Sequence, residues 1–437
     1  MPCLLGNHRL KPNIDSLLPH KHLALFVALI STLAFQACSP ARRIAEQQPI
    51  TRSASLGGNE FQETTKMAVK SPWLKGNHVT SYTNGAEFYP AMLKAIRSAK
   101  KSITFETFAF VNGQTTYEFV SAFCERAKAG VNIHLILDAF GSEDFGKANL
   151  ARLRAHGVTV RFYHDQLMRH PIRYYTRDHR KLIVVDGKIG FTGGCGIADA
   201  WNGNAETPKN WRENHYKITG PVVAQIQRDF VDNWIHTGGA PLKGKDYFPK
   251  LQQTGKHNAQ NFISSPKDQH YTVPHLYRQA IASARKSIII ENSYYLPDAT
   301  ITKEILAARK RGVHVELILA GKHTDAWLIR YFSRLRYHTL LKAGVHIYEY
   351  QKSMLHCKVM VVDGVFSSIG SANFDARSLY INDESNLNVL DTNFANEQLR
   401  IIELDKHDSA RITKATSPWN PFTLPSRLAA SALAPQL

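Results

Sequence analysis

The sequence predicts an α/β protein made of two similar halves, and three observations lead to this prediction. Helical and strand patterns alternate along most of the chain. The same order of patterns occurs twice, and a short motif of histidine, lysine and aspartate occurs once in each copy. Such alternation is typical of mostly parallel or mixed sheets with helices on their faces. We therefore expect each half to be a mixed β-sheet flanked by helices.

The composition is that of a globular protein with a surplus of positive charge. A chain of 437 residues, of which 43% are hydrophobic, has room for two domains with buried cores. Its 54 Lys and Arg residues exceed its 36 Asp and Glu residues and leave a net charge of +18. This surplus favours a polyanionic partner, which could be a nucleic acid, an anionic membrane or a phosphorylated substrate. The five cysteines show neither zinc-ligand spacing nor a disulfide framework.

The first 38 residues are expected to direct the chain to a membrane. Basic residues precede an apolar run from Leu23 to Phe35, as in a signal peptide or a short membrane anchor. Ala37-Cys38 resembles a bacterial lipoprotein cleavage site, and lipidation of Cys38 is a further alternative. Each of these routes predicts an exported protein associated with a bacterial cell membrane. The polar residues 39–70 are expected to form a linker.

Two later segments repeat the same elements, and this internal repeat predicts the domain organisation. Domains are expected at 71–242 and 269–410, with a polar linker at 243–268 and a C-terminal tail at 411–437. In each domain a helix leads into a strand, and two further helix ends are each followed by a glycine and a buried strand. The matching segments are 95–103 and 280–288, 129–137 and 311–319, and 155–160 and 343–347.

A further strand in each half begins with the motif His-x-Lys-x4-Asp. Strand alternation puts His and Lys on one face, and Asp-Gly makes the turn into the next strand. One copy alone could be a strand that enters the core from a basic loop. Two copies at corresponding places indicate function, because a fold that needs only hydrophobic strands has no reason to repeat His and Lys. The motif residues are His179, Lys181 and Asp186 in the first half, and His356, Lys358 and Asp363 in the second.

This pair of motifs resembles the signature of the phospholipase D superfamily, and the chain is most similar to its bacterial cardiolipin synthases. The resemblance extends from about Gly76 to Asp391. It implies two phospholipase D-like halves packed with pseudo-twofold symmetry around one active site. The segments outside the motifs that support the subgroup are 84–90, 105–108, 191–194, 197–199, 211–215, 348–350 and 370–379.

Two histidines can divide the chemistry of phosphodiester exchange between them. One unprotonated imidazole attacks phosphorus, while the other protonates the departing glycerol oxygen and then activates the incoming alcohol. The motif lysines neutralise the phosphoryl oxygens. The residues alone leave the two roles interchangeable, whereas the resemblance implies His179 as the nucleophile and His356 as the acid and base. No metal and no other cofactor is implied.

Each imidazole also needs a carboxylate that fixes its tautomer and stabilises the imidazolium. By resemblance to related enzymes, Glu213 and Glu384 occupy the matching places downstream of the motifs, and solvated surface carboxylates are the alternative. Asp186 and Asp363 lie next to turns and look more structural than catalytic, despite their place in the signature.

The resemblance implies a phosphate-binding segment in each half. In the second half Asn373 resembles the phosphate-binding amide of the family, and Ser371 belongs to the same Gly-Ser-x-Asn segment. Gly194 lies in the matching segment of the first half, which has Gly196 where asparagine is expected. This departure removes one phosphate hydrogen bond from the expected symmetry.

The same chemistry serves lipids and nucleic acids, so the substrate is a separate question. Residues 164–177 and the segment Trp327–Tyr337, which is expected to be helical, mix arginines with aromatic and aliphatic residues. Such mixtures suit a lipid interface. The helix could instead pack on its own sheet, and aromatics beside arginines could stack on nucleobases. The export signal and the resemblance favour an anionic phospholipid membrane, with phosphatidylglycerol and cardiolipin, over nucleic acid.

We therefore expect a phosphatidyltransferase that moves phosphatidyl from phosphatidylglycerol to a second phospholipid alcohol. Transfer exceeds hydrolysis only if a lipid alcohol outcompetes water at the phosphohistidine. Phospholipase D hydrolysis, an exported metal-independent nuclease and a non-catalytic lipid-binding protein stay open as alternatives. No obligate protein partner is implied, because one chain carries both motifs.

Overall fold

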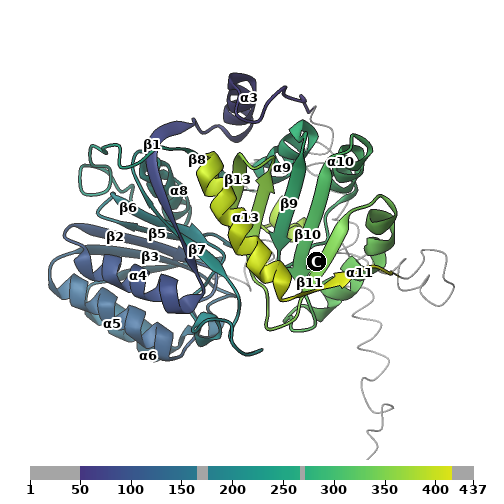
Figure 1. Ribbon diagram of the computed structural model, residues 1–437. Helices are drawn as coiled ribbons and strands as arrows, with labels where there is room; N and C mark the ends of the chain where they lie inside the picture. The colour runs from purple at the N-terminus through teal and green to yellow at the C-terminus, as the bar shows by residue number, and fades with distance from the viewer. Residues whose placement is uncertain (1–49, 165–175, 266–270, 416–437) are drawn as a thin grey trace, which may run out of the picture.

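The structure, a computed structural model, describes residues 50–164, 176–265 and 271–415. Within these residues two similar halves lie side by side and share one 15-stranded sheet (Figure 1). The α/β class, with mixed sheets flanked by helices, is therefore confirmed. The expected signal or anchor, Cys38, most of the loop 164–177 and most of the C-terminal tail lie outside the described residues. No helix among the described residues combines the length and the apolar character needed to cross a membrane.

The first half contains seven strands in the order β4-β3-β2-β5-β6-β7-β1. Strands β2, β3 and β4 are parallel to one another, and the pairs from β2 through β5, β6 and β7 to β1 are antiparallel. The elements are β1 (Leu74–Thr83), α4 (Gly85–Ser98), β2 (Ser102–Thr107), α5 (Gln114–Lys128), β3 (Asn132–Asp138), α6 (Lys147–Ala155), β4 (Thr159–Tyr163), β5 (Lys181–Val185), β6 (Ile189–Gly193), β7 (Asn214–Thr219) and α8 (Val223–His236), with short 3-10 turns at Glu143–Phe145 and Asp199–Trp201.

The second half repeats this arrangement strand for strand, in the order β11-β10-β9-β12-β13-β14-β8. Strands β8 and β1 join the two halves as an antiparallel pair, and β15 is added at the far edge beside β11. The elements are β8 (His257–Ser264), α9 (Thr272–Ser283), β9 (Ser287–Asn292), α10 (Ala299–Lys310), β10 (His314–Ala320), α11 (Trp327–Lys342), β11 (His346–Tyr350), β12 (Lys358–Val362), β13 (Phe366–Gly370), α12 (Ala376–Tyr380), β14 (Glu384–Leu390), α13 (Thr392–His407) and β15 (Ser409–Ile412).

Local sequence explains where these elements begin and end. The glycines after α5 and α10, Gly130 and Gly312, have φ of 83° and 86°, the left-handed conformation that favours glycine at a helix end. The motif strands β5 and β12 end in turns with positive φ at both central residues, as in type I′ hairpins. The glycine stops and the Asp-Gly turns expected from the sequence are therefore present in both halves.

Strand alternation divides the core into layers. On β5, Ile183 and Val185 face the helices of the first half, whereas Leu182 and Val184 face a core to which both halves contribute. Strand β12 behaves in the same way, with Met360 facing its own helices. The shared core also contains apolar residues of α8 and α13, and Figure 1 shows α13 lying across the strands of the second half. The halves are thus held together by buried apolar surface as well as by the sheet.

Two segments that were expected to be linkers contain regular structure. Helix α3 (Asn59–Val69) lies inside the expected linker 39–70, and its Phe61 belongs to the core of the second half. Strand β8 lies inside the expected linker 243–268 and pairs with β14 and β1. The sequence of β8 is polar because its buried Gln260 and Asn261 form hydrogen bonds with other side chains and backbone atoms rather than apolar contacts. Polar composition alone was therefore a misleading sign of a linker here.

Candidate active site

The two motifs meet at the junction of the halves, because each is hydrogen-bonded to a segment of the opposite half. The backbone N–H of His179 donates to the carbonyl of Asp383 at 2.9 Å, and the N–H of His356 donates to the carbonyl of Arg212 at 2.7 Å. Asp383 and Arg212 each directly precede one of the two predicted site glutamates. The pseudo-twofold arrangement thus exchanges segments between the halves at the site.

The predicted histidines and glutamates form two pairs, and each pair joins the two halves. The Nδ1 atom of His179 lies 2.9 and 3.0 Å from the carboxylate oxygens of Glu384, and Nδ1 of His356 lies 2.6 Å from Oε2 of Glu213. Both glutamates are fully buried, so they are not solvated surface carboxylates. Each motif histidine is therefore oriented by the glutamate that follows the motif of the other half. In both pairs Nδ1 faces the carboxylate, which leaves Nε2 for chemistry.

Burial and neighbouring cations disfavour the protonated form of both imidazoles. Burial lowers the pKa of His179 to about 4, with a further lowering by Lys181 and Lys358, although Glu384 opposes the shift. Burial also lowers the pKa of His356 well below its ordinary value, and both motif lysines and His179 add to this. Because these groups act on one another across the halves, they form one electrostatic unit.

The two glutamates differ in their proton affinity. Burial raises the pKa of Glu213 to about 7, although Lys358 opposes the shift. Burial also acts to raise the pKa of Glu384, but His179, Lys181 and the hydroxyl of Ser371 outweigh it, so that the pKa is lowered. The site therefore contains one firmly ionised carboxylate and one that titrates near neutral pH.

The motif lysines are the first residues of β5 and β12, beside the carboxyl ends of β2 and β9. Lys181 Nζ donates to the carbonyl of His179 at 2.6 Å, and Lys358 Nζ donates to Oγ of Ser293 at 2.7 Å. Burial lowers the pKa of Lys181 to about 8, and burial lowers the pKa of Lys358 too. Two buried ammonium groups close to two imidazoles make the site suited to an anionic substrate.

Gly194 and Ser371, which were expected to bind substrate, lie against the two glutamates. A Cβ atom on Gly194 would lie 2.3 Å from Oε2 of Glu213, so only glycine leaves room for that carboxylate. The Oγ of Ser371 donates to Oε2 of Glu384 at 2.5 Å and accepts from the backbone N–H of Ser385. These contacts show how both residues support the carboxylates, and their part in substrate binding stays a prediction.

Asn373 remains a candidate for phosphate binding. Its side chain is buried, and its Oδ1 has no hydrogen-bond partner among the described residues. A buried amide that lacks a partner is costly unless a ligand or water completes its hydrogen bonds. The structure thus leaves Oδ1 of Asn373 with unused hydrogen-bonding capacity, two residues after the Ser371 that donates to Glu384.

Asp186 and Asp363 hold turns together at the other ends of the motif strands. The carboxylate of Asp186 accepts hydrogen bonds from the backbone N–H groups of residues 100–102. Asp363 accepts from those of residues 285–287 in the same way. Neither carboxylate has a hydrogen bond or ion pair with the site histidines, and the hydrogen bonds that both accept stabilise turns. The interpretation of both as structural agrees with these contacts.

Aromatic side chains line both imidazoles, although they were not among the site residues expected from the sequence. The ring centroid of Phe108 lies 5.3 Å from that of His179. Trp211, Trp201 and Tyr294 lie 5.2, 5.4 and 6.0 Å from the ring of His356. Phe108 and Trp211 lie in the segments 105–108 and 211–215, and the resemblance of these segments to the family could have identified both residues. Trp201 had no such signal, because it lies outside those segments.

Buried ion pairs also lie beside the glutamates, and no sequence pattern predicted them. The guanidinium of Arg212 makes two hydrogen bonds to the carboxylate of Asp405 on α13, at 2.7 and 2.6 Å. Arg180, which lies between His179 and Lys181 in the first motif, is 3.7 Å from Asp383 of the second half. Both arginines are buried, and both connect a glutamate segment to the other half. Such pairs hold the crossing segments in register, because removing one partner leaves an uncompensated buried charge.

Comparison with known proteins agrees with this arrangement. The family described as "Cardiolipin synthase, PLD-like domain" matches residues 92–234 and 277–405, one stretch in each half. Cardiolipin synthase 2 of Bacillus anthracis is 33% identical over 338 residues, covering 76% of this chain and 65% of that protein. Cardiolipin synthase A of Pseudomonas syringae pv. syringae is 31% identical over 392 residues, covering 85% of this chain and 80% of that protein.

A solved structure has the same fold. The phosphatidylserine synthase of Haemophilus influenzae superposes with a TM-score of 0.67, covering 87% of this chain and 100% of that one at 13% identity. At this identity the likeness concerns the fold alone. The family match in both halves, the identity to the cardiolipin synthases and the paired motifs lead to one conclusion: the chain belongs to the cardiolipin synthase family of the phospholipase D superfamily.

Proposed function

We propose that the protein is a phosphatidyltransferase that moves phosphatidyl from phosphatidylglycerol to the hydroxyl of a second phospholipid, releasing glycerol. The observation that carries the proposal is the pair of buried His–Glu contacts, each made across the halves, beside two buried lysines. Membership of the cardiolipin synthase family supports the choice of reaction. The chain spans 65% of the length of the Bacillus anthracis relative, so the complete activity is part of the proposal.

In the first step, Nε2 of His179 attacks phosphorus and the bond from phosphorus to the glycerol oxygen breaks. The departing oxygen takes a proton from His356, so glycerol leaves as a neutral alcohol. The ionised Glu384 stabilises the positive charge that His179 gains when it forms the phosphohistidine. The motif lysines face the charge that spreads over the phosphoryl oxygens.

In the second step, the roles reverse. The hydroxyl of a second phospholipid gives its proton to His356 and attacks phosphorus, and the bond to His179 breaks. His356 must therefore hold a proton in one step and accept one in the next. Two features support this role: the pKa of about 7 for Glu213, and its 2.6 Å contact with His356, across which a proton can be shared near neutral pH. A bound phosphodiester anion would also offset the two lysines and raise the pKa of His356.

Exposed aromatic residues at the edge of the sheet that bears the site support a lipid substrate. Phe140, 48% exposed, follows β3, and Trp327, 70% exposed, begins α11 after β10. Both lie beyond the carboxyl ends of parallel strands, as do the motif lysines. The segment Trp327–Tyr337 forms a helix as expected, and Phe332 and Leu335 on its other face are buried. One face of this helix therefore packs on its own half and the other face is exposed. We propose that the exposed face meets a membrane.

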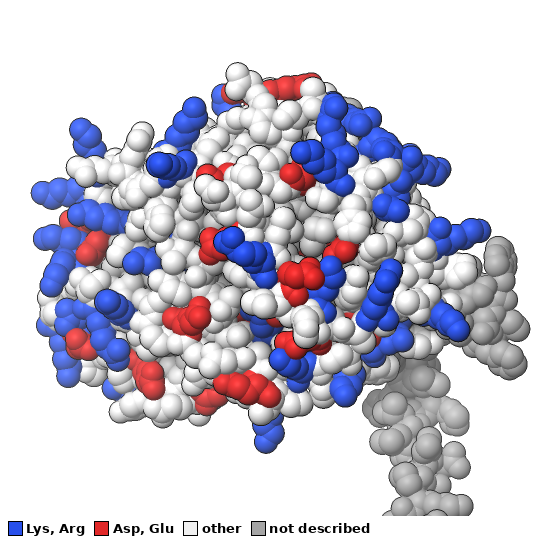
Figure 2. Space-filling model, viewed as in Figure 1, with Lys and Arg blue, Asp and Glu red and all other residues white. Residues whose placement is uncertain are grey.

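A cavity on the second half also supports a lipid substrate. It has a volume of about 840 Å³ and lies between α10 and α11, and one of its lining residues, Tyr295, directly follows the Tyr294 whose ring lies 6.0 Å from that of His356. Apolar side chains such as Leu306 and Leu340 line it, together with the basic Arg336. Apolar walls with cations at hand match an acyl chain attached to a phosphate. Figure 2 shows Lys and Arg side chains over much of the viewed surface, densely over α10, which suits an anionic membrane.

The test is product analysis with the purified full chain and phosphatidylglycerol in mixed micelles. Cardiolipin and glycerol in equal amounts support the proposal, and His179→Gln should abolish both. The matched control is His338→Gln, which changes a partly exposed histidine on α11. Phosphatidic acid without cardiolipin would mean hydrolysis and would overturn the transfer reaction. Cleavage of plasmid DNA with inert lipid would instead identify a nuclease.

A further inference from the structure

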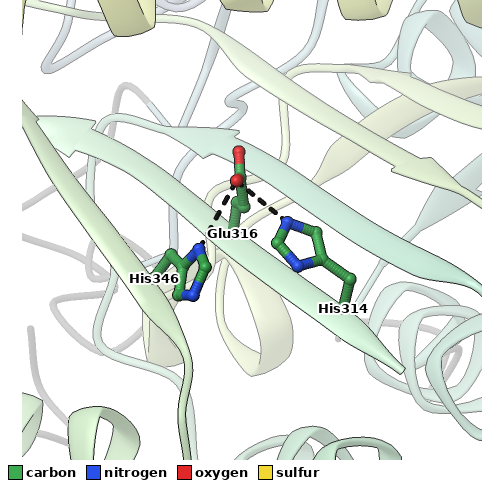
Figure 3. Close-up of side chains that lie close together, drawn as sticks. All are labelled: His314, Glu316 and His346. Carbon is green, nitrogen blue, oxygen red and sulfur yellow. Dashed lines mark hydrogen bonds and ion pairs between the residues drawn. The ribbon is translucent and has the colours of Figure 1, made fainter. Parts of the chain in front are cut away.

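Three metal-ligating side chains lie together on the second half, away from the catalytic groups. His314 and Glu316 alternate along β10 and so face the same side of the sheet, and the register of β11 places His346 directly beside Glu316. Figure 3 shows the three side chains converging from the two neighbouring strands. On β9, Ser287 and Ile289 pair with His314 and Glu316, whereas Asn292 pairs with Lys358 of β12. The cluster therefore lies three to five residues, or roughly 10–16 Å, along the strands from the catalytic lysine.

The geometry of the cluster fits a single metal ion. Oε1 of Glu316 lies 2.9 Å from Nε2 of His314 and 3.6 Å from Nδ1 of His346, and the three atoms lie within 4.8 Å of one another. Ligands of a tetrahedral zinc ion at 2.0–2.1 Å are separated by roughly 3.3 Å, so small side-chain rotations suffice. The imidazoles are 44% and 36% exposed, which gives an ion access from solvent and leaves room for a water ligand.

The two oxygens of Glu316 have different partners. Oε1 faces the histidines, whereas Oε2 lies 3.1 Å from Nζ of Lys406 on α13. Lys406 also lies 3.0 Å from Glu403, so its charge is partly offset by a second carboxylate. The lysine fixes the orientation of Glu316 and leaves Oε1 as a single ligand atom. Its positive charge also opposes a nearby cation, which should limit the affinity.

We propose that His314, Glu316 and His346 bind one zinc ion, with water as the fourth ligand. Two imidazole nitrogens and one carboxylate oxygen suit zinc and related transition metals, whereas calcium and magnesium prefer sites made of oxygen atoms. The ion joins β10 to β11 at their amino ends and so ties together the edge of the second half. This inference is independent of the proposed reaction, because none of the three residues touches the catalytic groups.

The first experiment counts tight zinc sites on the full chain by equilibrium dialysis. The chain has 20 histidines, so background binding is expected, and the readout is the difference between variants. The double variant His314→Asn/His346→Gln should lose one tight equivalent, whereas His338→Gln should lose none. Second-sphere changes weaken metal sites about 10- to 100-fold, so loss of a direct ligand in Glu316→Gln should weaken this site by more than about 100-fold. Equal stoichiometry in the double variant and the parent would overturn the proposal.

The second experiment locates the ion and tests the opposing charge. Anomalous diffraction at the zinc edge should place the ion within about 2.3 Å of all three ligand atoms. Lys406→Met should tighten zinc binding roughly tenfold, because it removes a unit charge a few ångströms from the ion. An ion bound elsewhere would contradict this site, and weaker binding in Lys406→Met would contradict the opposing effect of the lysine charge. Calcium and magnesium should not compete at equal concentration.

Discussion

The crossed pairing of glutamates and histidines makes a prediction that separates the two proposed catalytic roles. In Glu384→Gln the side chain keeps its shape but loses the charge that lies 2.9 Å from Nδ1 of His179. A charge-assisted hydrogen bond exceeds a neutral one by about 1 kcal/mol. A unit charge about 4 Å from the developing imidazolium contributes about 4 kcal/mol at an effective dielectric constant of 20. Formation of the phosphohistidine should therefore slow roughly 5- to 1000-fold.

The assay is rapid-quench measurement of the covalent intermediate, with two lipid substrates. Phosphatidylglycerol needs a proton on its leaving group, whereas a phosphatidyl ester of p-nitrophenol does not. Glu384→Gln should be slow with both lipids, because it impairs the nucleophile. The matched variant Glu213→Gln impairs His356 and should be slow with phosphatidylglycerol, by up to the 10²- to 10⁴-fold typical of general acid catalysis, but nearly normal with the activated ester.

The refuting result is specific. Mass spectrometry should find the trapped phosphate on His179. If it does, and Glu213→Gln is nevertheless the variant that stays slow with the activated ester, then each glutamate serves the histidine of its own half and the crossed pairing is wrong. A phosphate on His356 would instead exchange the two roles. Circular dichroism and unfolding of both variants provide the control for folding.

Four further predictions follow from the same contacts. Burial raises the pKa of Glu213 from 4.5 to about 7, so ionising this carboxyl in the folded state costs about 3 kcal/mol at pH 8 and almost nothing at pH 4. Glu213→Gln should therefore raise the melting temperature much more at pH 8 than at pH 4. An equal rise at both pH values would contradict the buried charge. Gly194→Ala should remove most transfer activity, because its Cβ would lie 2.3 Å from the Glu213 carboxylate, and steady-state rates at unchanged helix content would check this. Asp186→Ala and Asp363→Ala should each lower the free energy of unfolding by about 2 kcal/mol or more, while the folded protein keeps its turnover number. Denaturant titration and activity assays would check this, and a turnover number that falls while the protein is still folded would reveal a catalytic role. Because burial lowers the pKa of Lys181 to about 8, kcat/KM should decline above that pH as the lysine loses its proton, and a profile flat to pH 10 would argue against a charged Lys181 in phosphate binding.

The sequence by itself determined the class of fold, the repeat and the motif residues. These features are local: apolar alternation sets which face of a strand is buried, a glycine ends a helix, and Asp-Gly makes a turn, so each can be read within a few residues. The Asp-Gly turns beside Asp186 and Asp363 are local in this sense, whereas the backbone groups that bind the two carboxylates lie 84–86 and 76–78 residues away and are found only in the structure. The limits of the linkers were harder, because the buried polar side chains of β8 hide a strand behind a linker-like composition.

Only the tertiary structure decided which groups work together. A repeat predicts that Glu213 and Glu384 are equivalent, but the pseudo-twofold packing exchanges them, so that each contacts the histidine of the other half. The roles of Gly194 and Ser371 depend on that exchange. The His314, Glu316 and His346 cluster has the same origin, because residues about 30 apart become neighbours only when β10 and β11 pair in one register. Side-chain patterns specify faces of strands, whereas the choice of neighbouring strand comes from the packing of the whole chain.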